Sequence, residues 1–302
     1  MKDFYCVKDS TWCIDTGHTL IGAYRINDRD IVMLDSGMSY GAGETGRLMK
    51  ALEGAGLNVK AIVATHGHWD HIGNNKNLVE KYGCKVYMYG DEAYACRNEE
   101  GVIFHRSLLP YNDEIKKTYA CMTSCVHEFI DPDAEYIEIC GKRFGIVHTP
   151  GHSSAHITII TEDNVAMAGD VLMTENEIVK TKIPYAANFA IDFRSKRKLA
   201  SLNCDKYIIS HRGIREDIEH EVEANINYLK GRAEVVLSYI EDGMTYDDIV
   251  AAVINCMNIK VTNRFYFSDI HGMVMPYVQY LEETGRVYAE FDKGYVRYTV
   301  ID

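Results

Sequence analysis

The stretch THGHWDHIGN, residues 65 to 74, places three histidines and one aspartate within six positions, at His66, His68, Asp70 and His71. It follows the apolar, β-branched segment VKAIVAT, which predicts a buried strand that ends at Thr65. Residues two apart in an extended chain point to the same side, so His66 and His68 should face the same way. Asp70 and His71 come at the turn into the next helix. Because imidazole and carboxylate are good zinc ligands, the four at this spacing indicate a metal site.

Three other predicted strands also end beside a metal-binding side chain. HTPGHSSAH follows the strand FGIVHT and holds His152 after a Pro-Gly turn, NVAMAGD ends in Asp170, and KYIISHRG holds His211. A structural zinc site is closed by four ligands and does no chemistry. Seven donors are too many for one tetrahedral ion and suit two ions that share a carboxylate. The sequence therefore predicts a two-metal site with a catalytic purpose.

The order of predicted elements indicates two sheets that face each other, with helices outside. Segments of strand and helix alternate up to residue 213. From residue 214 the pattern is helical, through EVEANINYLKGRAEVVLSYIEDG, TYDDIVAAVINC with a Thr245 N-cap, and GMVMPYVQYLEETG, and RVYAEFDKGYVRYTV reads as a hairpin. We therefore predict a catalytic domain at 1–213 and, at 214–302, a helical C-terminal domain with a terminal hairpin that is winged-helix-like. It would cover the active-site mouth or build a homodimer.

The composition of the chain limits the classes of partner that it can bind. The net charge is −12, and residues 216–302 carry 16 acidic and 7 basic residues, which disfavours nucleic acid as the main partner. The nine cysteines are odd in number and irregular in spacing, as in a protein with reduced thiols. We see no apolar run suited to a signal peptide and no stretch of 18 apolar residues. We expect a cytoplasmic protein with no membrane partner and a small-molecule substrate.

The set THGHWDH, TPGHSSAH, AGD and SHRG resembles the metallo-β-lactamase superfamily, in the branch of glyoxalase II and related hydrolases. The resemblance covers about residues 15 to 212 and implies an α/β fold, a four-layer αβ/βα sandwich. It implies a first metal on His66, His68 and His152, a second on Asp70, His71 and His211, and Asp170 between them. Ala155 and Arg212 depart slightly from the usual motifs.

The same resemblance implies roles for neighbouring residues. Asp35 in VMLDSG would support a metal-binding histidine, with a plain turn role as the alternative. His148 is expected in the core or beside the ligands. His156 begins the next strand and is expected to hydrogen-bond near the site.

The implied reaction is metal-dependent hydrolysis. Two zinc ions would activate a bridging hydroxide that attacks the carbonyl of a small thioester, ester or lactone, and Asp70 would orient it or relay its proton. Iron and manganese are alternative occupants. Two alternatives stay open: an iron persulfide dioxygenase, which holds one iron on the same ligand set, and a single-strand RNA endonuclease.

The substrate pocket should be built from loops around the metals. The candidates are Met38 and Tyr40 in SGMSYGAGE, the stretch 101–128 with His105 and His127, and Tyr185 in TKIPYAANFAIDF. Tyr185 could donate a hydrogen bond to an oxyanion or could be an ordinary packed tyrosine. These residues would choose the substrate.

Overall fold

The computed structural model describes residues 3–39, 43–106 and 112–301. The first half of the chain forms a seven-stranded sheet whose strands lie in sequence order. These strands are β1 (Phe4–Lys8), β2 (Thr11–Asp15), β3 (Leu20–Arg25), β4 (Asp30–Leu34), β5 (Asn58–Val63), β6 (Lys85–Tyr89) and β7 (Glu128–Ile130). The first four strands pair antiparallel, and β4 to β7 pair in parallel.

Helices connect the parallel strands of this sheet, because parallel neighbours need a crossover. The crossovers are α1 (Glu44–Gly54), then α2 (Trp69–Ile72) and α3 (Asn75–Tyr82), then α4 (Gly90–Ala95), α5 (Glu99–Arg106), α6 (Asp113–Tyr119) and the 3-10 turn η1 (Ala120–Met122). Of the stretch 101–128, expected as a pocket loop, residues 101–106 and 113–122 are helical, and 107–111 lie outside the described residues.

The second sheet has six strands in the order β13-β12-β11-β10-β9-β8. Its strands are β8 (Tyr136–Ile139), β9 (Lys142–His148), β10 (Ile157–Ile160), β11 (Val165–Met173), β12 (Lys206–His211) and β13 (Gly213–Arg215). Only β11 and β12 pair in parallel among them. Their crossover runs through α7 (Glu175–Ile178) and α8 (Phe189–Ala200).

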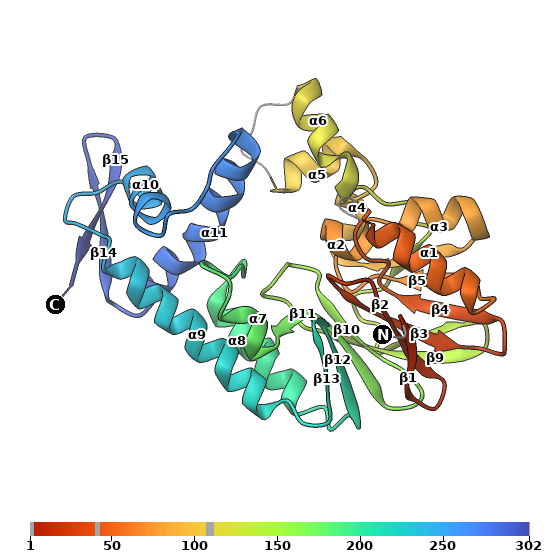
Figure 1. Cartoon of the computed structure of the whole chain (residues 1–302). Coiled ribbons are helices and arrows are strands. Elements are labelled where there is room, and N and C mark those ends of the chain that lie inside the picture. The colour runs from red at the N-terminus through yellow and green to blue at the C-terminus, as the bar shows by residue number, and fades with distance from the viewer. Residues whose placement is uncertain (1–2, 40–42, 107–111, 302) are drawn as a thin grey trace.

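Three apolar clusters define the four layers. One lies between the sheets and joins Val63 of the first to Phe144 and Met167 of the second. Another packs Leu48 of α1 under the outer face of the first sheet. A third covers the outer face of the second sheet with α8 and the C-terminal helices. The chain is therefore the αβ/βα sandwich that the resemblance implied (Figure 1).

The C-terminal part consists of α9 (Glu219–Leu237), α10 (Tyr246–Cys256), α11 (Arg264–Glu283) and the hairpin β14 (Val287–Asp292) and β15 (Tyr295–Val300). Thr245 caps α10 with a capping box to Asp248, as the sequence indicated. The boundary after residue 213 falls within β13, yet the apolar core crosses it, since Leu172 and Val222 belong to one cluster. We therefore propose the division at 1–213 and 214–302 as the place where the architecture changes from sandwich to helices. The two parts share one apolar core.

Several predicted boundaries were wrong. β5 ends at Val63 rather than Thr65, because Thr65 turns to donate its N–H to Asp35 and to accept from Ile157. The last helix begins at Arg264, eight residues earlier than GMVMPYVQYLEETG, behind an Asn263 N-cap that the sequence analysis passed over. Within the described part of the chain, no helix has the length and apolarity needed to cross a bilayer.

Candidate metal centre

The seven predicted donors meet at one end of the two sheets. Their ligand atoms form two groups, and within each group all atoms lie within 4.8 Å of one another. The first group is His66, His68, His152 and Asp170, and the second is Asp70, His71, Asp170 and His211. Asp170 belongs to both, which is the position required of a shared carboxylate.

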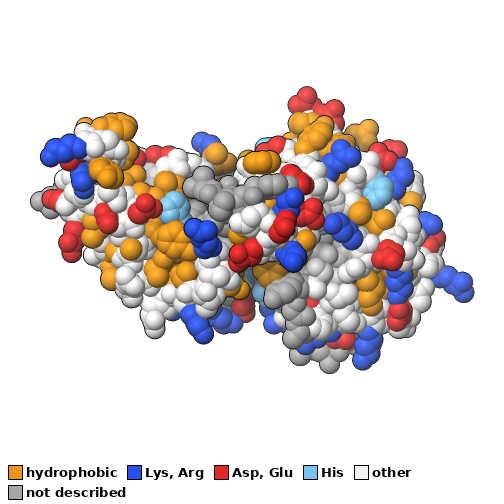
Figure 2. Space-filling model, turned by 90° about the horizontal axis from the view of Figure 1, so that it is seen from above, with side chains coloured by type: hydrophobic (Ala, Val, Ile, Leu, Met, Phe, Trp, Pro, Cys, Tyr) orange, Lys and Arg blue, Asp and Glu red, His pale blue; other side chains and the backbone are white. Residues whose placement is uncertain are grey.

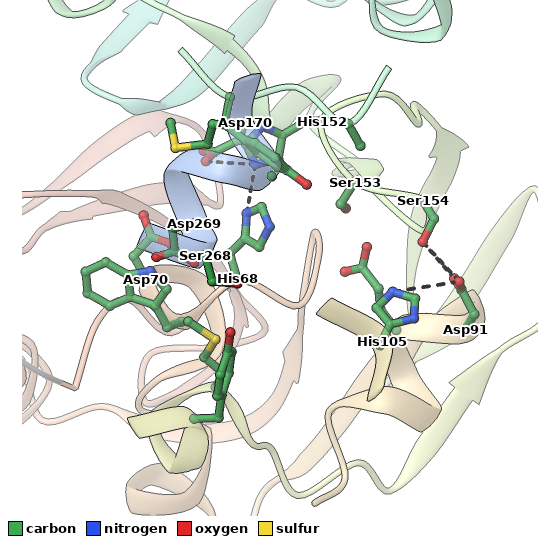
Figure 3. A pocket seen from close by; sticks show the side chains of 18 residues that line it. His68, Asp70, Asp91, His105, His152, Ser153, Ser154, Asp170, Ser268 and Asp269 are labelled. Atoms are coloured by element: carbon green, nitrogen blue, oxygen red, sulfur yellow. Dashed lines mark hydrogen bonds and ion pairs between the residues drawn. The ribbon is translucent and has the colours of Figure 1, made fainter. Parts of the chain in front are cut away.

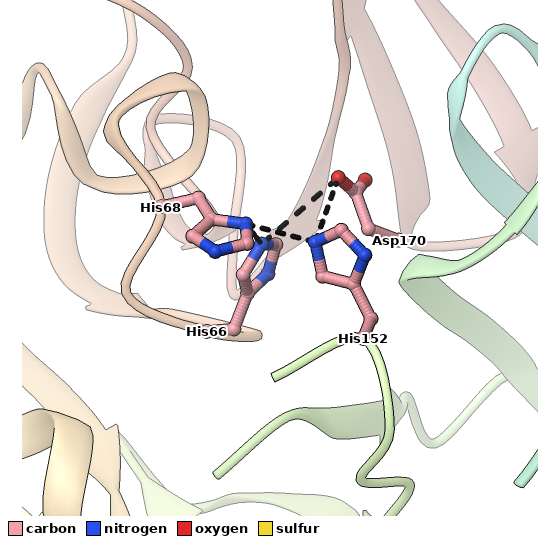
Figure 4. Close-up of side chains that lie close together, drawn as sticks. All are labelled: His66, His68, His152 and Asp170. Carbon is pink, nitrogen blue, oxygen red and sulfur yellow. Dashed lines mark hydrogen bonds and ion pairs between the residues drawn. The ribbon is translucent and has the colours of Figure 1, made fainter. Parts of the chain in front are cut away.

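The first group combines His66 and His68, which follow β5 of the first sheet, with His152 of the β9–β10 turn and Asp170 of β11 in the second (Figure 4). The Nδ1 atom of His68 lies 2.8 Å from Nε2 of His66 and 2.8 Å from Nε2 of His152. The Oδ2 atom of Asp170 is 3.5 Å from His152 Nε2 and 4.0 Å from His66 Nε2. Four donor atoms thus converge on one small volume.

The second group lies on the other side of Asp170. The Oδ1 atom of Asp170 is 3.1 Å from His71 Nε2, and the Oδ2 atom of Asp170 is 3.3 Å from His211 Nε2. Asp70 Oδ2 lies 3.4 Å from His211 Nε2 and 3.7 Å from His71 Nε2. Asp170 sits inside β11 rather than at its end, beside an irregularity where Gly169 has a positive φ of 58°.

Two atoms of the donor groups lack hydrogen bonds within the protein, as expected of metal ligands. His71 Nε2 and Asp170 Oδ1 are buried and lack a well-formed hydrogen bond, although they lie 3.1 Å apart. Buried polar atoms are almost always hydrogen-bonded, so two such atoms without a hydrogen bond in a histidine and carboxylate cluster are unusual. Cations held between these lone pairs would satisfy both atoms.

Asp35 contacts His71 directly and His66 through the Thr65 hydroxyl. It is in the left-handed region at φ 69°, and its Oδ2 accepts from Thr65 Oγ1 at 2.8 Å and from His71 Nδ1 at 2.8 Å. Because the Thr65 hydroxyl donates to Asp35, its oxygen accepts from His66 Nδ1 at 3.1 Å. Both rings are therefore held with Nε2 directed at the cluster.

His156 is buried and lies behind Asp170. Its Nε2 accepts the Asp170 N–H at 3.0 Å, so Nδ1 carries the proton and donates to Thr149 Oγ1 at 2.9 Å. The expectation for His148 was wrong: it is exposed at the end of β9, where Nε2 lies 3.0 Å from the Ser154 carbonyl oxygen.

In the metal-free protein the two groups differ in charge. Burial lowers the pKa of His66 and of His152. Burial also opposes protonation of His211, but the Asp170 and Asp70 carboxylates outweigh it and raise the pKa to about 10. For His71 the carboxylates of Asp170, Asp70 and Asp35 likewise overcome burial and raise the pKa well above its ordinary value. His66 and His152 are therefore neutral imidazoles, whereas His71 and His211 hold protons.

A cavity of about 530 Å³ opens beside the centre (Figure 3). Its described lining comes from α2, α4, α5, α6, η1, the β9–β10 turn, β11, the segment before α8, and α11. The lining residues are His68, Trp69, Asp70, Asp91, Glu92, His105, Tyr119, Met122, His152, Ser153, Ser154, Asp170, Tyr185, Ala187, Ser268, Asp269, Gly272 and Met273. Five of these are acidic, and none of the described ones is Lys or Arg.

A match to the metallo-beta-lactamase superfamily model extends over residues 15–211, about two thirds of the chain. The chain belongs to the metallo-β-lactamase superfamily. A hydroxyacylglutathione hydrolase of Haemophilus influenzae, GloC, is 28% identical over 200 residues, or 66% of this chain and 87% of the relative. A probable metallo-hydrolase of Bacillus subtilis, YflN, is 28% identical over 47% of this chain and 56% of its own length.

Solved structures share the fold over nearly the whole chain. A metallo-beta-lactamase family protein of Thermus thermophilus superposes with a TM-score of 0.68 at 22% identity and covers 94% of both chains. A beta-lactamase domain protein of Burkholderia ambifaria gives 0.67 at 18% identity and covers 99% of this chain and 94% of that one. The helical C-terminal part is therefore within the shared fold. The predicted class, a metal-dependent hydrolase of this superfamily, is confirmed.

The pocket predictions had mixed outcomes. Tyr185 lines the cavity, 36% exposed, with its ring centroid 5.7 Å from that of His68 and 5.4 Å from that of His152. His105 also lines it, whereas His127 is exposed and donates no side chain to the described lining. Met38 is buried outside that lining, because its segment turns inward and its carbonyl accepts from Asn74. Tyr40 lies outside the described residues.

The wall supplied by α11 was not predicted from the sequence. Ser268, Gly272 and Met273 lie on one helical face that reaches the cavity, and Phe265 packs on Tyr119 with ring centroids 5.3 Å apart. Their spacing marks a helix face, but no local pattern says which surface that face meets. Glu92 was missed for the same reason.

Proposed function

We propose that this chain is a two-metal hydrolase that cleaves small thioesters, esters or lactones. The observation that carries the proposal is the sharing of Asp170 between two donor groups at the wall of a cavity. The superfamily relatives support the hydrolytic class, and one is named for an acylglutathione, which is a thioester. We further propose zinc as the metal, since the donors are imidazole and carboxylate in four-atom groups.

The chain's own residues divide the work. His66, His68 and His152 would hold one ion, Asp70, His71 and His211 the other, and Asp170 both. When bound, such ions lower the pKa of water to roughly 7 and polarise a carbonyl oxygen. Asp70 faces the cavity and lies next to both His71 and His211, so its carboxylate can orient the attacking water or take its proton.

Tyr185 is placed to assist at the carbonyl. Its ring lies beside those of His68 and His152 in the first donor group. Its phenol can therefore donate a hydrogen bond to the carbonyl oxygen that becomes negative during attack. Replacing Tyr185 by Phe should lower kcat about 100-fold or more if this is its role. An unchanged kcat would make it a packing residue.

The cavity favours a small substrate over a polyanion. About 530 Å³ accommodates a metabolite-sized molecule, and the acidic residues of the described lining oppose a polyanion. Basic and acidic side chains are interspersed on the face seen in Figure 2, which shows no continuous basic track for a nucleic acid. We therefore favour an acyl substrate over RNA.

The test replaces His68 or Asp170 by Ala and measures bound zinc and turnover on thioesters, esters and lactones. Both should fall together. The control is His220→Ala, an exposed histidine on α9 that pairs with Glu175. If zinc content and turnover survive in the two site variants, the proposal is wrong. Oxygen uptake with a persulfide and one bound iron would instead favour the dioxygenase.

A further inference from the structure

Glu92 is a buried carboxylate that touches both segments carrying the first group of histidines. It lies in α4, 1% exposed. Its Oε2 accepts the Gly67 N–H at 2.5 Å, and its Oε1 accepts the Ala155 N–H at 3.2 Å. Gly67 stands between His66 and His68, and Ala155 stands three residues after His152. One side chain thus joins the ligand-bearing loops of two different sheets.

We propose that Glu92 is the positioning residue of the first metal group, and that it keeps His66 and His68 in register with His152. The inference rests on the proposed function, because it assumes that these histidines bind a metal. Glu92 would act through the backbone of the loops, without touching the metal.

The surroundings of Gly67 show how closely α4 holds this peptide. A Cβ atom at Gly67 would lie 2.6 Å from Cys96 Sγ and 3.0 Å from Glu92 Oε2. The Cys96 thiol also approaches the Gly67 carbonyl oxygen at 3.6 Å. Gly67, between the two histidines, is therefore bound on its N–H and on its C=O from the same helical segment, and a side chain at residue 67 would displace it.

In the opposite loop, α4 also accepts from a side chain, since Ser154 Oγ donates to Asp91 at 3.0 and 3.1 Å, but Glu92 binds the backbone itself at Ala155. The two sheets are also linked by Ile157 N–H to Thr65 C=O at 2.8 Å, but that bond lies before His66 and after His156. It fixes the strand ends and leaves the direction of the Gly67 and Ala155 peptides open. Hydrogen bonds from N–H groups to a carboxylate are stronger than neutral ones, and Glu92 accepts such a bond from the backbone of both loops.

The test is Glu92→Gln, which keeps the size of the side chain. Its amide has one acceptor oxygen, so its NH₂ must face the N–H of Gly67 or of Ala155, and one of the two bonds is lost. We expect zinc affinity at the first group to fall about 10- to 100-fold, as for loss of other groups that orient metal ligands. Excess zinc should restore most of kcat. The matched control is Glu44→Gln. Glu44 is also a buried carboxylate, but it accepts a hydrogen bond from Thr16 and contacts neither ligand-bearing loop of the first group.

Two readouts separate positioning from simple stability. Zinc affinity is measured by competition with a chelator, and the rise of Tm on adding zinc is compared with that of the wild type. A smaller zinc-dependent rise in Glu92→Gln supports the proposal, whatever the Tm of the metal-free variant. If the metal-free variant does not fold, the rate of zinc loss from protein loaded during expression replaces the affinity, and a rate equal to wild type overturns the inference.

Affinity within twofold of wild type also overturns it, even with a lower Tm, because Glu92 would then be merely structural. A wild-type protein that binds no metal would refute the proposed function instead, which keeps the two failures distinct.

Discussion

The protons held by the second metal group should make its metal affinity strongly dependent on pH. His211 has a pKa of about 10 in the metal-free protein, against 6.5 for an ordinary histidine, since the attraction of Asp170 and Asp70 exceeds the effect of burial. A metal ion must displace this proton to reach Nε2. The perturbation is therefore a change of pH during metal binding.

The size of the effect follows from the pKa. At pH 7 the solution lies about three pH units below the pKa of His211, so removal of the proton costs about 4 kcal/mol. Each unit of pH rise below 10 should tighten the second ion about tenfold for each proton displaced. His66 and His152 have lowered pKa values, so the first ion should bind with nearly constant affinity above pH 7.

The stability of the folded, metal-free protein changes with pH in the opposite direction to the metal affinity. The raised pKa means that the folded, metal-free protein binds this proton more tightly than the unfolded chain does. The resulting stabilisation is complete below about pH 6.5 and is lost as pH rises towards 10. The metal-free protein should therefore lose stability over the range in which the second ion binds better.

The assay is competition against a chelator at about pH 6.5, 7.5 and 8.5, together with calorimetry in two buffers of different ionisation enthalpy, which counts the protons released. We expect at least one proton released by the second ion near neutral pH, and fewer by the first. Equal pH slopes for the two ions, or no proton released by the second, would refute the reasoning.

Two further changes test the support of the site. Asp35→Asn removes the carboxylate that holds His71, and metal affinity should fall about 10- to 100-fold by chelator competition; an unchanged affinity would show that the ring is held by other contacts. Lys196→Met leaves the buried Asp192 without its partner at 2.5 Å and should cost about 3–5 kcal/mol in urea unfolding. Adding Asp192→Leu should recover much of that loss, and a single variant with wild-type stability would contradict the prediction.

Local patterns were enough for much of this protein. Strands such as β4, β6 and β12 were predicted because apolar and β-branched residues recur in short runs between turn residues. The α10 helix was predicted with its cap, because Thr245 and Asp248 form a motif within four residues. Boundaries failed where tertiary contacts competed, as at Thr65, which leaves its strand to bond Asp35 across a distance of 30 residues.

The seven candidate ligands illustrate the division most clearly. Histidine and aspartate are costly at the ends of apolar strands, so their chemistry was visible in the sequence alone. The sequence, through the resemblance that its motifs carry, therefore predicted the sandwich fold, the candidate donors and the class of reaction. Which helix walls the cavity and which carboxylate joins the two loops were decided only by tertiary structure. Those relations connect Gly67 with Ala155 and Tyr119 with Phe265, residues far apart in the chain whose meeting no local period or motif encodes.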